Sequence, residues 1–371
     1  MAIPSARRSF PGAHDQDAGE RDLATRLRRH AAGLERHSRS PLCATLMRGA
    51  AEDIDADGVV SRAFAGIPLP RGQAPGLRLL AALHRLVLGG EVPALARFYP
   101  SGDGGAQLAA VWPVARAVIE DRFLEVRAAL RQGVQTNEPG RSAVLFGVLL
   151  LAAQRHGLAL RLLEPGASGG LNLLADRYGY ALRETPLSLI GDPGSPLRFI
   201  EPWVGTPVAD PQAAASRLDI PARAGCDLHP LDPADPDDRM TLRSYIWPDE
   251  LERMHRLDAA LAVAKSGRIT VERASAAPWL KARLDEPMPG TATVVWQSVF
   301  AQYLPAAERD SIAAVIAAAG GRARDPLLWA RMEPGEDPVA GFEITLASWP
   351  DAGEVELLGH AGDHGPPVTW I

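Results

Sequence analysis

An apolar run, a glycine-rich loop and a helical stretch follow one another near the middle of the chain, and this succession constrains the fold more than any other feature. The apolar run is Leu158–Leu163, which has the length of a buried strand. The loop is Glu164–Gly170, and the helical stretch is Leu171–Tyr178. A strand that passes through glycines into a helix leaves free N–H groups at a tight turn, where a ligand can approach the backbone. The succession predicts an α/β fold with a ligand site at this turn.

The spacing of the small residues in the loop indicates which ligand to expect. Gly166, Ser168 and Gly170 follow Glu164 in the pattern E-x-G-x-S-x-G, whereas NAD sites carry G-x-G-x-x-G. An acidic residue two places before the first glycine resembles the S-adenosylmethionine loop of class I methyltransferases. By that resemblance, Glu164, Gly166, Ser168 and Gly170 would hold the methionine end of the cofactor. An NAD-dependent oxidoreductase is the alternative that this spacing disfavours.

A second acidic residue is expected at the end of the next strand, where its carboxylate would bind the ribose hydroxyls. Asp227 stands in Gly225–Asp232, which resembles the G-x-D-x-x-P string of many methyltransferases. Asp192 competes by its distance from the loop, but its surroundings, Gly191–Gly194, resemble a turn. We prefer Asp227, and this choice requires a β insertion near residues 179–224.

Strand-like and helical stretches alternate along the rest of the chain, which is typical of a parallel sheet with helices on its faces. The last two predicted strands leave no room for a helix between them and should pair as an antiparallel hairpin. The predicted fold is therefore α/β: a Rossmann domain like that of class I S-adenosylmethionine methyltransferases, with a mostly parallel sheet that ends in this hairpin. The predicted strands are Thr291–Val295, Leu327–Ala330, Phe342–Ala347 and Val355–Leu358, and the predicted helices are Pro248–Ala264 and Ala306–Ala319.

Before the loop the pattern is helical almost throughout. Leu23, Leu27, Ala31 and Leu34 recur at the spacing of one helix face. The chain thus divides into a disordered N-terminal tail at residues 1–20, an all-helical domain at 21–134 and the Rossmann domain at 135–371. The further predicted helices are Pro41–Asp53, Leu77–Leu88, Pro93–Phe98, Val111–Gln132 and Pro139–His156.

Composition and charge exclude several classes of protein. The 39 basic and 45 acidic side chains give a net charge of −6, which disfavours a general nucleic-acid binder. Cys43 and Cys226 are the only cysteines, so neither a disulfide framework nor a cysteine zinc site is supported, and we expect no metal. The longest apolar stretch, Ala143–Ala153, is too short to cross a bilayer, and no export signal is present. We expect a cytoplasmic protein without membrane contact.

The two halves of the chain carry opposite charge. Residues 1–160 hold 20 basic and 15 acidic side chains, and residues 161–371 hold 19 basic and 30 acidic side chains. The first half therefore has a net charge of +5 and the second half a net charge of −11. This asymmetry predicts that the helical part docks against the rest of the chain. The alternative is a binding site for an acidic partner on the helical part.

A dense polar cluster precedes the helix that leads into the first strand. Gln135, Asn137, Glu138 and Arg141 would lie near the cofactor end of the sheet and line a pocket there. A capped helix start is the alternative, because Pro139 suits a first helical turn and the neighbouring Asn or Glu can cap it.

Four further side chains are candidates for the pocket. Asn172 and Asp176 follow the glycine loop, and Gln297 and Tyr303 follow the strand at Thr291–Val295. Tyr303 can equally pack the following segment onto the sheet. If the substrate must lose a proton, Glu138 or Tyr303 is the candidate base.

Several longer strings of the chain together carry a family resemblance. The strings are Ser40–Leu42, Tyr99–Ser101, Gln135–Glu138 with Arg141, Glu164–Leu173 with Asp176–Tyr178, Gly225–Asp232 and Trp247–Asp249. Through them the chain is similar, over residues 20–370, to the bacterial family catalogued as domain of unknown function 2332. The resemblance implies a helical N-terminal part followed by a methyltransferase-like Rossmann domain, and it implies no reaction, because the family has no established activity.

One departure from the family bears on the cofactor. The family tends to have a G-D-A string near Ala274–Ala276, and methyltransferases often place an acid there against the adenine amino group. This chain lacks that acid, and Glu272 would be its substitute.

The sequence therefore supports an S-adenosylmethionine-dependent methyltransferase that acts on an unknown small molecule. Asp227 would bind the ribose of the cofactor. The alternative is a non-catalytic protein that uses the same scaffold to bind a metabolite or a partner.

Overall fold

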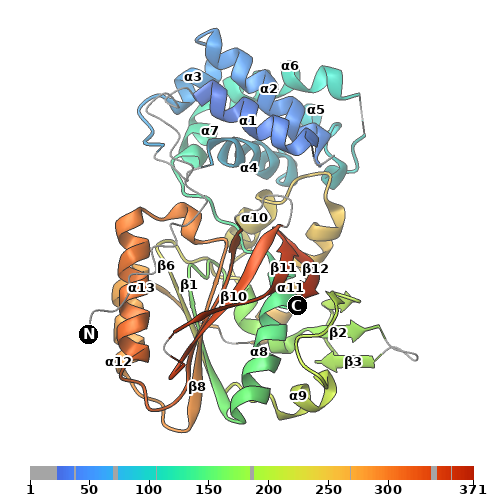
Figure 1. The fold of residues 1–371 in the computed structure, drawn as a ribbon. Helices are drawn as coiled ribbons and strands as arrows, with labels where there is room; N and C mark the ends of the chain where they lie inside the picture. The colour runs from blue at the N-terminus through green and yellow to red at the C-terminus, as the bar shows by residue number, and fades with distance from the viewer. Residues whose placement is uncertain are drawn as a thin grey trace.

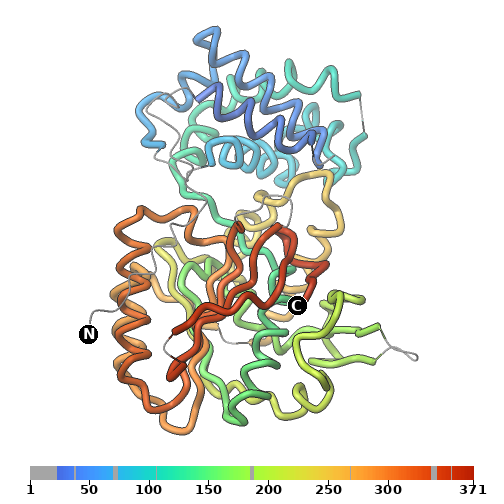
Figure 2. Tube along the Cα trace, in the orientation of Figure 1, coloured from blue at the N-terminus to red at the C-terminus, as the bar shows by residue number. Residues whose placement is uncertain are grey.

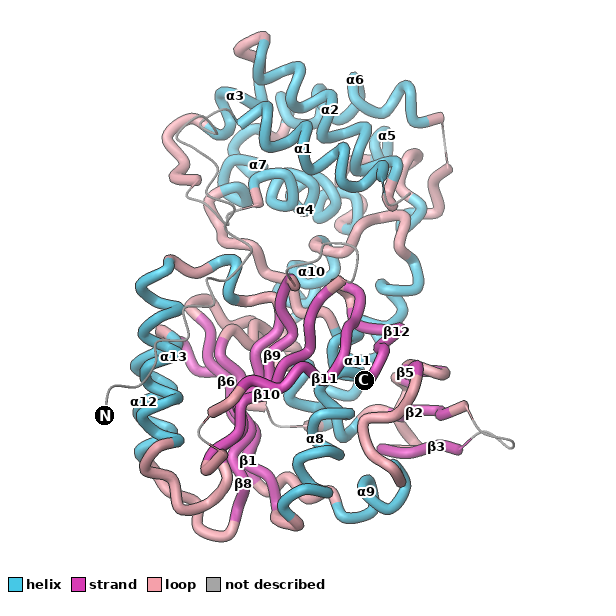
Figure 3. Tube along the Cα trace, viewed as in Figure 1, coloured by secondary structure: helices cyan, strands magenta, loops and turns pink. Residues whose placement is uncertain are grey.

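The computed structural model describes residues 23–36, 39–69, 74–105, 107–183, 188–267, 269–335, 341–351 and 353–371. The tail predicted at residues 1–20 lies outside these residues. The described chain forms a helical region followed by an α/β region, as Figures 1 and 3 show. The prediction of an α/β fold with a helical N-terminal part is confirmed at this level.

The helical region is built from amphipathic helices around its own apolar core. In the first helix, Leu27, Ala31 and Leu34 are buried at the predicted spacing. The second helix begins at Pro41, and the Ser40 side chain caps it by accepting a hydrogen bond from the Cys43 N–H at 3.2 Å. The helices are α1 (Leu23–Arg36), α2 (Pro41–Asp55), α3 (Val59–Phe64), α4 (Pro75–Leu88), α5 (Pro93–Ala96), α6 (Val111–Asp121) and α7 (Phe123–Leu130).

Two helix predictions need correction. The single helix predicted over Val111–Gln132 is two helices, because Arg122 between them has φ −105° and ψ 32°, outside the helical range. The predicted α-helix at Leu171–Tyr178 is a tighter 3-10 helix at Leu171–Arg177.

The α/β region contains one large sheet with the strand order β5-β12-β11-β10-β9-β8-β1-β6-β7. The strands from β9 to β7 in this order pair in parallel, and those from β12 to β9 pair antiparallel. The predicted hairpin is present as β10 and β11. The strands are β1 (Ala159–Pro165), β5 (Trp203–Val204), β6 (Ala222–Asp227), β7 (Val271–Arg273), β8 (Thr291–Ser298), β9 (Leu327–Pro334), β10 (Phe342–Trp349), β11 (Val355–Gly362) and β12 (Gly365–Trp370).

The sequence does not predict three of these strands. β5 has two residues and lies in the region predicted as a β insertion. β7 has three residues, too few to show an apolar pattern. β12 begins with Gly365-Pro366-Pro367, which are typical of a loop.

Helices cover both faces of the sheet, since successive residues of a strand point to opposite sides. Leu162 and Val294 pack with α8 and α11 on one face, and Leu163 and Val295 pack with α12 and α13 on the other. The 3-10 helix at Pro139–Arg141 leads directly into α8. The helices of this region are α8 (Ser142–His156), α9 (Pro211–Arg217), α10 (Pro236–Ser244), α11 (Leu251–Ser266), α12 (Ala276–Asp285) and α13 (Ala306–Gly320).

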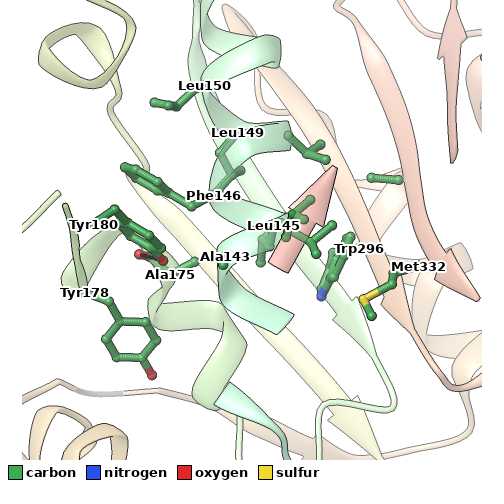
Figure 4. Packing of buried hydrophobic residues seen from close by; sticks show 14 of the residues in the cluster. Ala143, Leu145, Phe146, Leu149, Leu150, Ala175, Tyr178, Tyr180, Trp296 and Met332 are labelled. Atoms are coloured by element: carbon green, nitrogen blue, oxygen red, sulfur yellow. Dashed lines mark hydrogen bonds between the residues drawn. The ribbon is translucent and has the colours of Figure 1, made fainter. Parts of the chain in front are cut away.

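A second, small sheet packs against α8. Its strands are β2 (Gly179–Leu182), β3 (Ser188–Gly191) and β4 (Arg198–Ile200), in the order β3-β2-β4. The ring of Tyr180 stacks on that of Phe146 in α8, with centroids 4.1 Å apart, and Figure 4 shows this contact beside Tyr178. In the same view, Leu145 lies toward Trp296 and Met332 of the large sheet. One helix therefore joins the two sheets through a continuous core.

The helical region lies across one end of the large sheet, as the tube in Figure 2 shows. His84 of α4 joins the two parts, because its Nδ1 lies 3.2 Å from the Ser244 carbonyl oxygen. Arg39 and Arg85 of the helical region form ion pairs with Asp363 and Asp237. The signs of these pairs match the charge asymmetry of the sequence. In the described part of the chain, no helix has both the length and the apolar character that a bilayer crossing requires.

Candidate functional site

The glycine loop follows the carboxyl end of β1, where β6 also ends. The N–H groups of Gly166 and Ala167 donate to the Cys226 carbonyl oxygen at 2.8 and 3.0 Å. The Ser168 N–H donates to Asp227 Oδ2 at 3.0 Å. Because β1 and β6 pair in parallel, these bonds hold the loop against the end of its neighbouring strand.

Glu164, the last acidic residue of β1, is buried without a full set of partners. Its side chain is 3% exposed. Oε1 has a long contact of 3.5 Å from Asn172 Nδ2, and Oε2 has no hydrogen-bond partner among the residues that the structure describes. Burial raises the pKa of Glu164 to about 8, although Asn172 and Arg141 oppose the shift. A buried carboxyl with an oxygen left without a partner carries a desolvation cost that the fold does not offset.

Polar residues before α8 and at its first position form hydrogen bonds with the glycine loop and the residues that follow it. Ser168 Oγ donates to Gln135 Oε1 at 2.9 Å, and the Leu171 N–H donates to Asn137 Oδ1 at 2.9 Å. Ser142 Oγ donates to Asn172 Oδ1 at 2.8 Å. These bonds connect residues 30 to 34 positions apart in the sequence and fix the loop conformation.

Glu138 is buried in a cluster of arginines. It accepts hydrogen bonds from Arg253 Nε at 2.8 Å and from the Gly140 N–H at 2.9 Å, and Arg256 lies 3.6 Å away. Burial alone would raise the pKa of Glu138, but Arg253, His364 and Arg256 outweigh it and lower the pKa to about 2. A carboxylate with so low a pKa stays ionised and is a weak base at neutral pH.

Arg141 is buried but has no ion-pair partner. Its Nε donates to the Asp363 carbonyl oxygen at 3.0 Å, and its Nη1 lies 3.5 Å from the Ser298 carbonyl oxygen. Within the described residues, no carboxylate lies at ion-pair distance from the guanidinium, and the residue as a whole is 9% exposed. Burial lowers the pKa of Arg141, yet arginine remains charged in proteins.

Two cavities adjoin at this end of the sheet. The loop cavity, of about 180 Å³, is lined by the glycine loop and by the ends of β1, β6 and β8. The junction cavity, of about 340 Å³, lies between α1 and α4 of the helical region and the end of the sheet. The residues that line both are Thr136, Asn137, Arg141, Val299 and Tyr303.

The loop cavity brings together most of the residues singled out from the sequence. Asp227, at the end of β6, is half-buried and accepts hydrogen bonds from Ser168 N and His229 N. Burial raises the pKa of Tyr303, which lies between the two cavities. The predicted residues that line this cavity are Gln135, Asn137, Arg141, Glu164, Gly166, Ser168, Asn172, Asp227 and Tyr303, whereas Glu138 lines the junction cavity.

Three predicted residues lie outside both cavities. Gly170 packs against Ile269 and Val271, and a side chain at this position would overlap them. Gln297 is buried and donates from Nε2 to Glu333 Oε1 at 2.8 Å. Asp176 pairs with Arg223 and lines a separate cavity of about 700 Å³.

Asp192, the competing acid, also lines that separate cavity, beside the small sheet. Its Oδ1 accepts a hydrogen bond from the Gly194 N–H at 2.8 Å, as an aspartate in a turn does. Asp227, and not Asp192, is therefore the acid that contacts the glycine loop.

Sequence reasoning missed one acid that organises the site. Glu333 Oε1 accepts hydrogen bonds from the N–H groups of Phe300 and Ala301, each at 3.1 Å, and burial raises its pKa. These bonds fix the turn after β8, which carries Phe300 and Tyr303 into the loop cavity. An acid at the end of a parallel strand was the available signal, but the predicted strand stops at Ala330, before Glu333.

Among the described residues, no group of three or more His, Cys, Asp or Glu side chains is placed to hold a metal ion. Comparisons with curated proteins and with solved structures gave no match. The sequence model of one family, described as "Uncharacterized protein conserved in bacteria (DUF2332)", matches residues 25–370. Since this match spans nearly the whole chain, the protein belongs to the DUF2332 family of uncharacterized conserved bacterial proteins.

Proposed function

We propose that this protein is an S-adenosylmethionine-dependent methyltransferase that acts on a small molecule. One observation carries the proposal: a buried carboxyl with a free oxygen, Glu164, and a buried guanidinium without a carboxylate, Arg141, line the same cavity. The methionine end of the cofactor carries an ammonium and a carboxylate. The two side chains offer the complementary charges for these two groups.

The energetics of the two side chains support this assignment. Folding has already removed Glu164 and Arg141 from water without giving either an ionic partner. A ligand that supplies the opposite charges recovers part of that desolvation cost. An ammonium near Glu164 also favours its ionised form, so we expect binding at neutral pH to release a proton from this carboxyl.

The end of β6 offers groups that suit the nucleoside part of the cofactor. Each Asp227 oxygen accepts one backbone N–H and has a lone pair left for a ribose hydroxyl. Leu228, beside it, is 56% exposed and lines the loop cavity, so it can pack against a flat base. Glu272 does not serve the base here, because it accepts hydrogen bonds from Trp279 and Arg283.

The strand order supports a nucleoside-type ligand at this place. The parallel strands are ordered β7-β6-β1-β8-β9, so the connections turn in opposite directions on the two sides of the β1–β8 pair. Ligands of open α/β sheets bind at the carboxyl ends of the strands at such a switch point. The loop cavity is at this point, since the ends of β1, β6 and β8 line it.

When bound, the cofactor would supply an electrophilic methyl group on a sulfonium. The chain's own residues would hold the cofactor and align the acceptor, which is the main requirement of methyl transfer. Because burial raises the pKa of Tyr303, its hydroxyl keeps its proton at neutral pH and acts as a hydrogen-bond donor. Glu138, tied to two arginines, serves as an ion pair within this proposal and not as the base.

The weakness of Glu138 and Tyr303 as bases favours a second candidate, a non-catalytic binder of the same ligand. Neither Glu138 nor Tyr303, the candidates drawn from the sequence, has a pKa suited to accept a proton at neutral pH. This candidate shares the cofactor site and differs in turnover. Binding of S-adenosylmethionine with no methyl transfer to any of a broad set of acceptors would favour it.

Calorimetric titration of the full-length protein tests the binding step. We expect S-adenosylmethionine and S-adenosylhomocysteine to bind, and NAD and NADP not to bind. Asp227→Asn should weaken binding about tenfold or more, because a hydrogen bond to a charged group is lost. The matched control is Asp192→Asn, which alters the other candidate acid in a different cavity and should bind normally. No binding of either sulfur ligand to the folded protein would refute the proposal.

A further inference from the structure

The junction cavity is large enough for a small ligand and is made by both parts of the chain. Its volume of about 340 Å³ is near the lower end of the range for small-molecule sites. His30 and Leu77 line it from the helical region, and Trp247, Tyr303 and Phe342 line it from the α/β region. The cavity therefore exists only where the two parts are docked.

The charged side chains around this cavity largely neutralise one another. Asp363 accepts two hydrogen bonds from Arg39 Nη1, at 2.7 and 2.9 Å, and Glu138 accepts one from Arg253 at 2.8 Å. Arg141 remains, and it also lines the loop cavity, where the proposed function gives it the cofactor carboxylate. The wall thus has no spare charge with which to balance a charged ligand.

The two histidines that line the junction cavity add no charge to its wall at neutral pH. His30 and His364 both line the cavity, and burial lowers the pKa of each, so both rings are neutral at neutral pH. A charged ligand that left water for this cavity would pay its desolvation cost without an ionic partner.

The remaining lining is uncharged and consists of apolar, aromatic and a few polar side chains. The Trp247 ring has the guanidinium carbons of Arg39 and Arg253 at 5.9 and 5.7 Å from its centroid, and His364 packs against it edge-on. These contacts hold the ring as a fixed wall. The uncharged polar side chains of the wall are Thr136, Asn137, Gln302, Tyr245 and Tyr303.

We propose that the junction cavity binds the methyl acceptor, and that this acceptor is an uncharged small molecule with a flat apolar ring and a hydrogen-bonding group. The term acceptor rests on the proposed function, because the two cavities adjoin at Arg141 and Tyr303. The binding site rests on the lining alone, whereas the absence of charge on its ligand also rests on the proposed function, which gives Arg141 the cofactor carboxylate.

A set of para-substituted phenols that are similar in shape and differ in charge tests the inference on the full-length protein. The probes are para-hydroxyacetophenone, which is uncharged, para-hydroxybenzoate, an anion, and tyramine, a cation. Binding is measured by saturation-transfer NMR and calorimetry, with and without S-adenosylhomocysteine. We expect the uncharged probe to bind about tenfold or more tightly than either charged probe. Tighter binding of a charged probe, or no binding of the uncharged one, would overturn the inference.

A variant that fills the cavity locates the site. Leu77→Trp, from α4, should weaken binding of para-hydroxyacetophenone about tenfold or more while S-adenosylhomocysteine binds as before. Leu124→Trp makes the same change at a helical-region position that is 79% exposed. It should alter the binding of neither para-hydroxyacetophenone nor S-adenosylhomocysteine. Equal binding of the uncharged probe to Leu77→Trp and wild type would place its site elsewhere and refute the inference.

The two proposals fail in distinguishable ways. If S-adenosylhomocysteine does not bind but the uncharged probe binds and is lost in Leu77→Trp, the cavity assignment stands and the methyltransferase proposal fails. If S-adenosylhomocysteine binds but none of the phenol probes does, the cavity assignment fails and the proposed cofactor site stands. If para-hydroxybenzoate binds best and Arg141→Gln abolishes this while cofactor binding remains, Arg141 serves the cavity ligand, which contradicts the uncharged acceptor.

Discussion

At the scale of single residues, Glu164 combines deep burial with an oxygen that no protein group satisfies. Native proteins rarely tolerate such a group without a use for it, since each unsatisfied buried polar atom costs stability. Asn172, itself oriented by Ser142, gives it only one long contact. In the proposed site, this carboxyl would receive the ammonium of the cofactor.

Glu164 should make the stability of the protein depend on pH. Burial raises its pKa from 4.5 to about 8, so the folded protein retains a proton that the unfolded chain releases over this range. The stabilisation is fully present below the unfolded pKa and is lost as the pH rises through the folded pKa. Glu164→Gln removes the titration, so the variant should gain stability relative to wild type as the pH rises, on the order of a few kcal/mol.

Chemical denaturation of both proteins at about pH 5 and about pH 9 measures this difference. Glu356→Gln, which changes an exposed carboxyl on β11 paired with Arg155, controls for the loss of an acid. If the stability of Glu164→Gln relative to wild type does not change between the two pH values, Glu164 does not have a raised pKa.

At the scale of elements, the turn after β1 depends on its contact with the turn after β8. Gly166 has φ +72°, which favours glycine, and a Cβ there would overlap the Phe300 ring. Glu333 in turn fixes the backbone of Phe300. Two loops that are distant in the sequence are therefore shaped to fit each other around the loop cavity.

Gly166→Ala should destabilise the protein and weaken the site. A residue other than glycine in this backbone region costs roughly 1–2 kcal/mol, and the overlap with Phe300 adds a cost of about the same size. Gly157→Ala, where φ is +64° and a Cβ meets open space, should show the backbone cost alone. Thermal unfolding and S-adenosylhomocysteine titration check both variants. Equal losses of stability in the two variants would contradict the tight packing at Phe300.

For the whole molecule, the sequence pattern predicts the layers of helix and sheet. It predicts the contacts between these layers less well. The spacing of Leu27, Ala31 and Leu34 predicts α1, and an acid after a strand predicts the position of Asp227 beside the loop. Both signals are local, because periodicity and strand ends are written in neighbouring residues.

Other features depend on which distant segments meet, and local patterns do not contain this information. Asp176 looked like a pocket residue because it follows the loop, but it turns away to pair with Arg223. The arginines that neutralise Glu138 come from α11, more than 100 residues further along the chain. The junction cavity requires α1 and α4 to dock on the sheet, and no motif predicts it.

The proposed cofactor site requires Glu164 to hold the ammonium of the cofactor's methionine end. Methylthioadenosine, which has the nucleoside and the sulfur but lacks the amino-acid end, isolates this contribution. Calorimetry should show that wild-type protein binds S-adenosylhomocysteine about tenfold or more tightly than methylthioadenosine, and that Glu164→Gln removes most of this preference. Equal affinity of wild-type protein for the two ligands, or an unchanged preference in Glu164→Gln, would contradict the assignment.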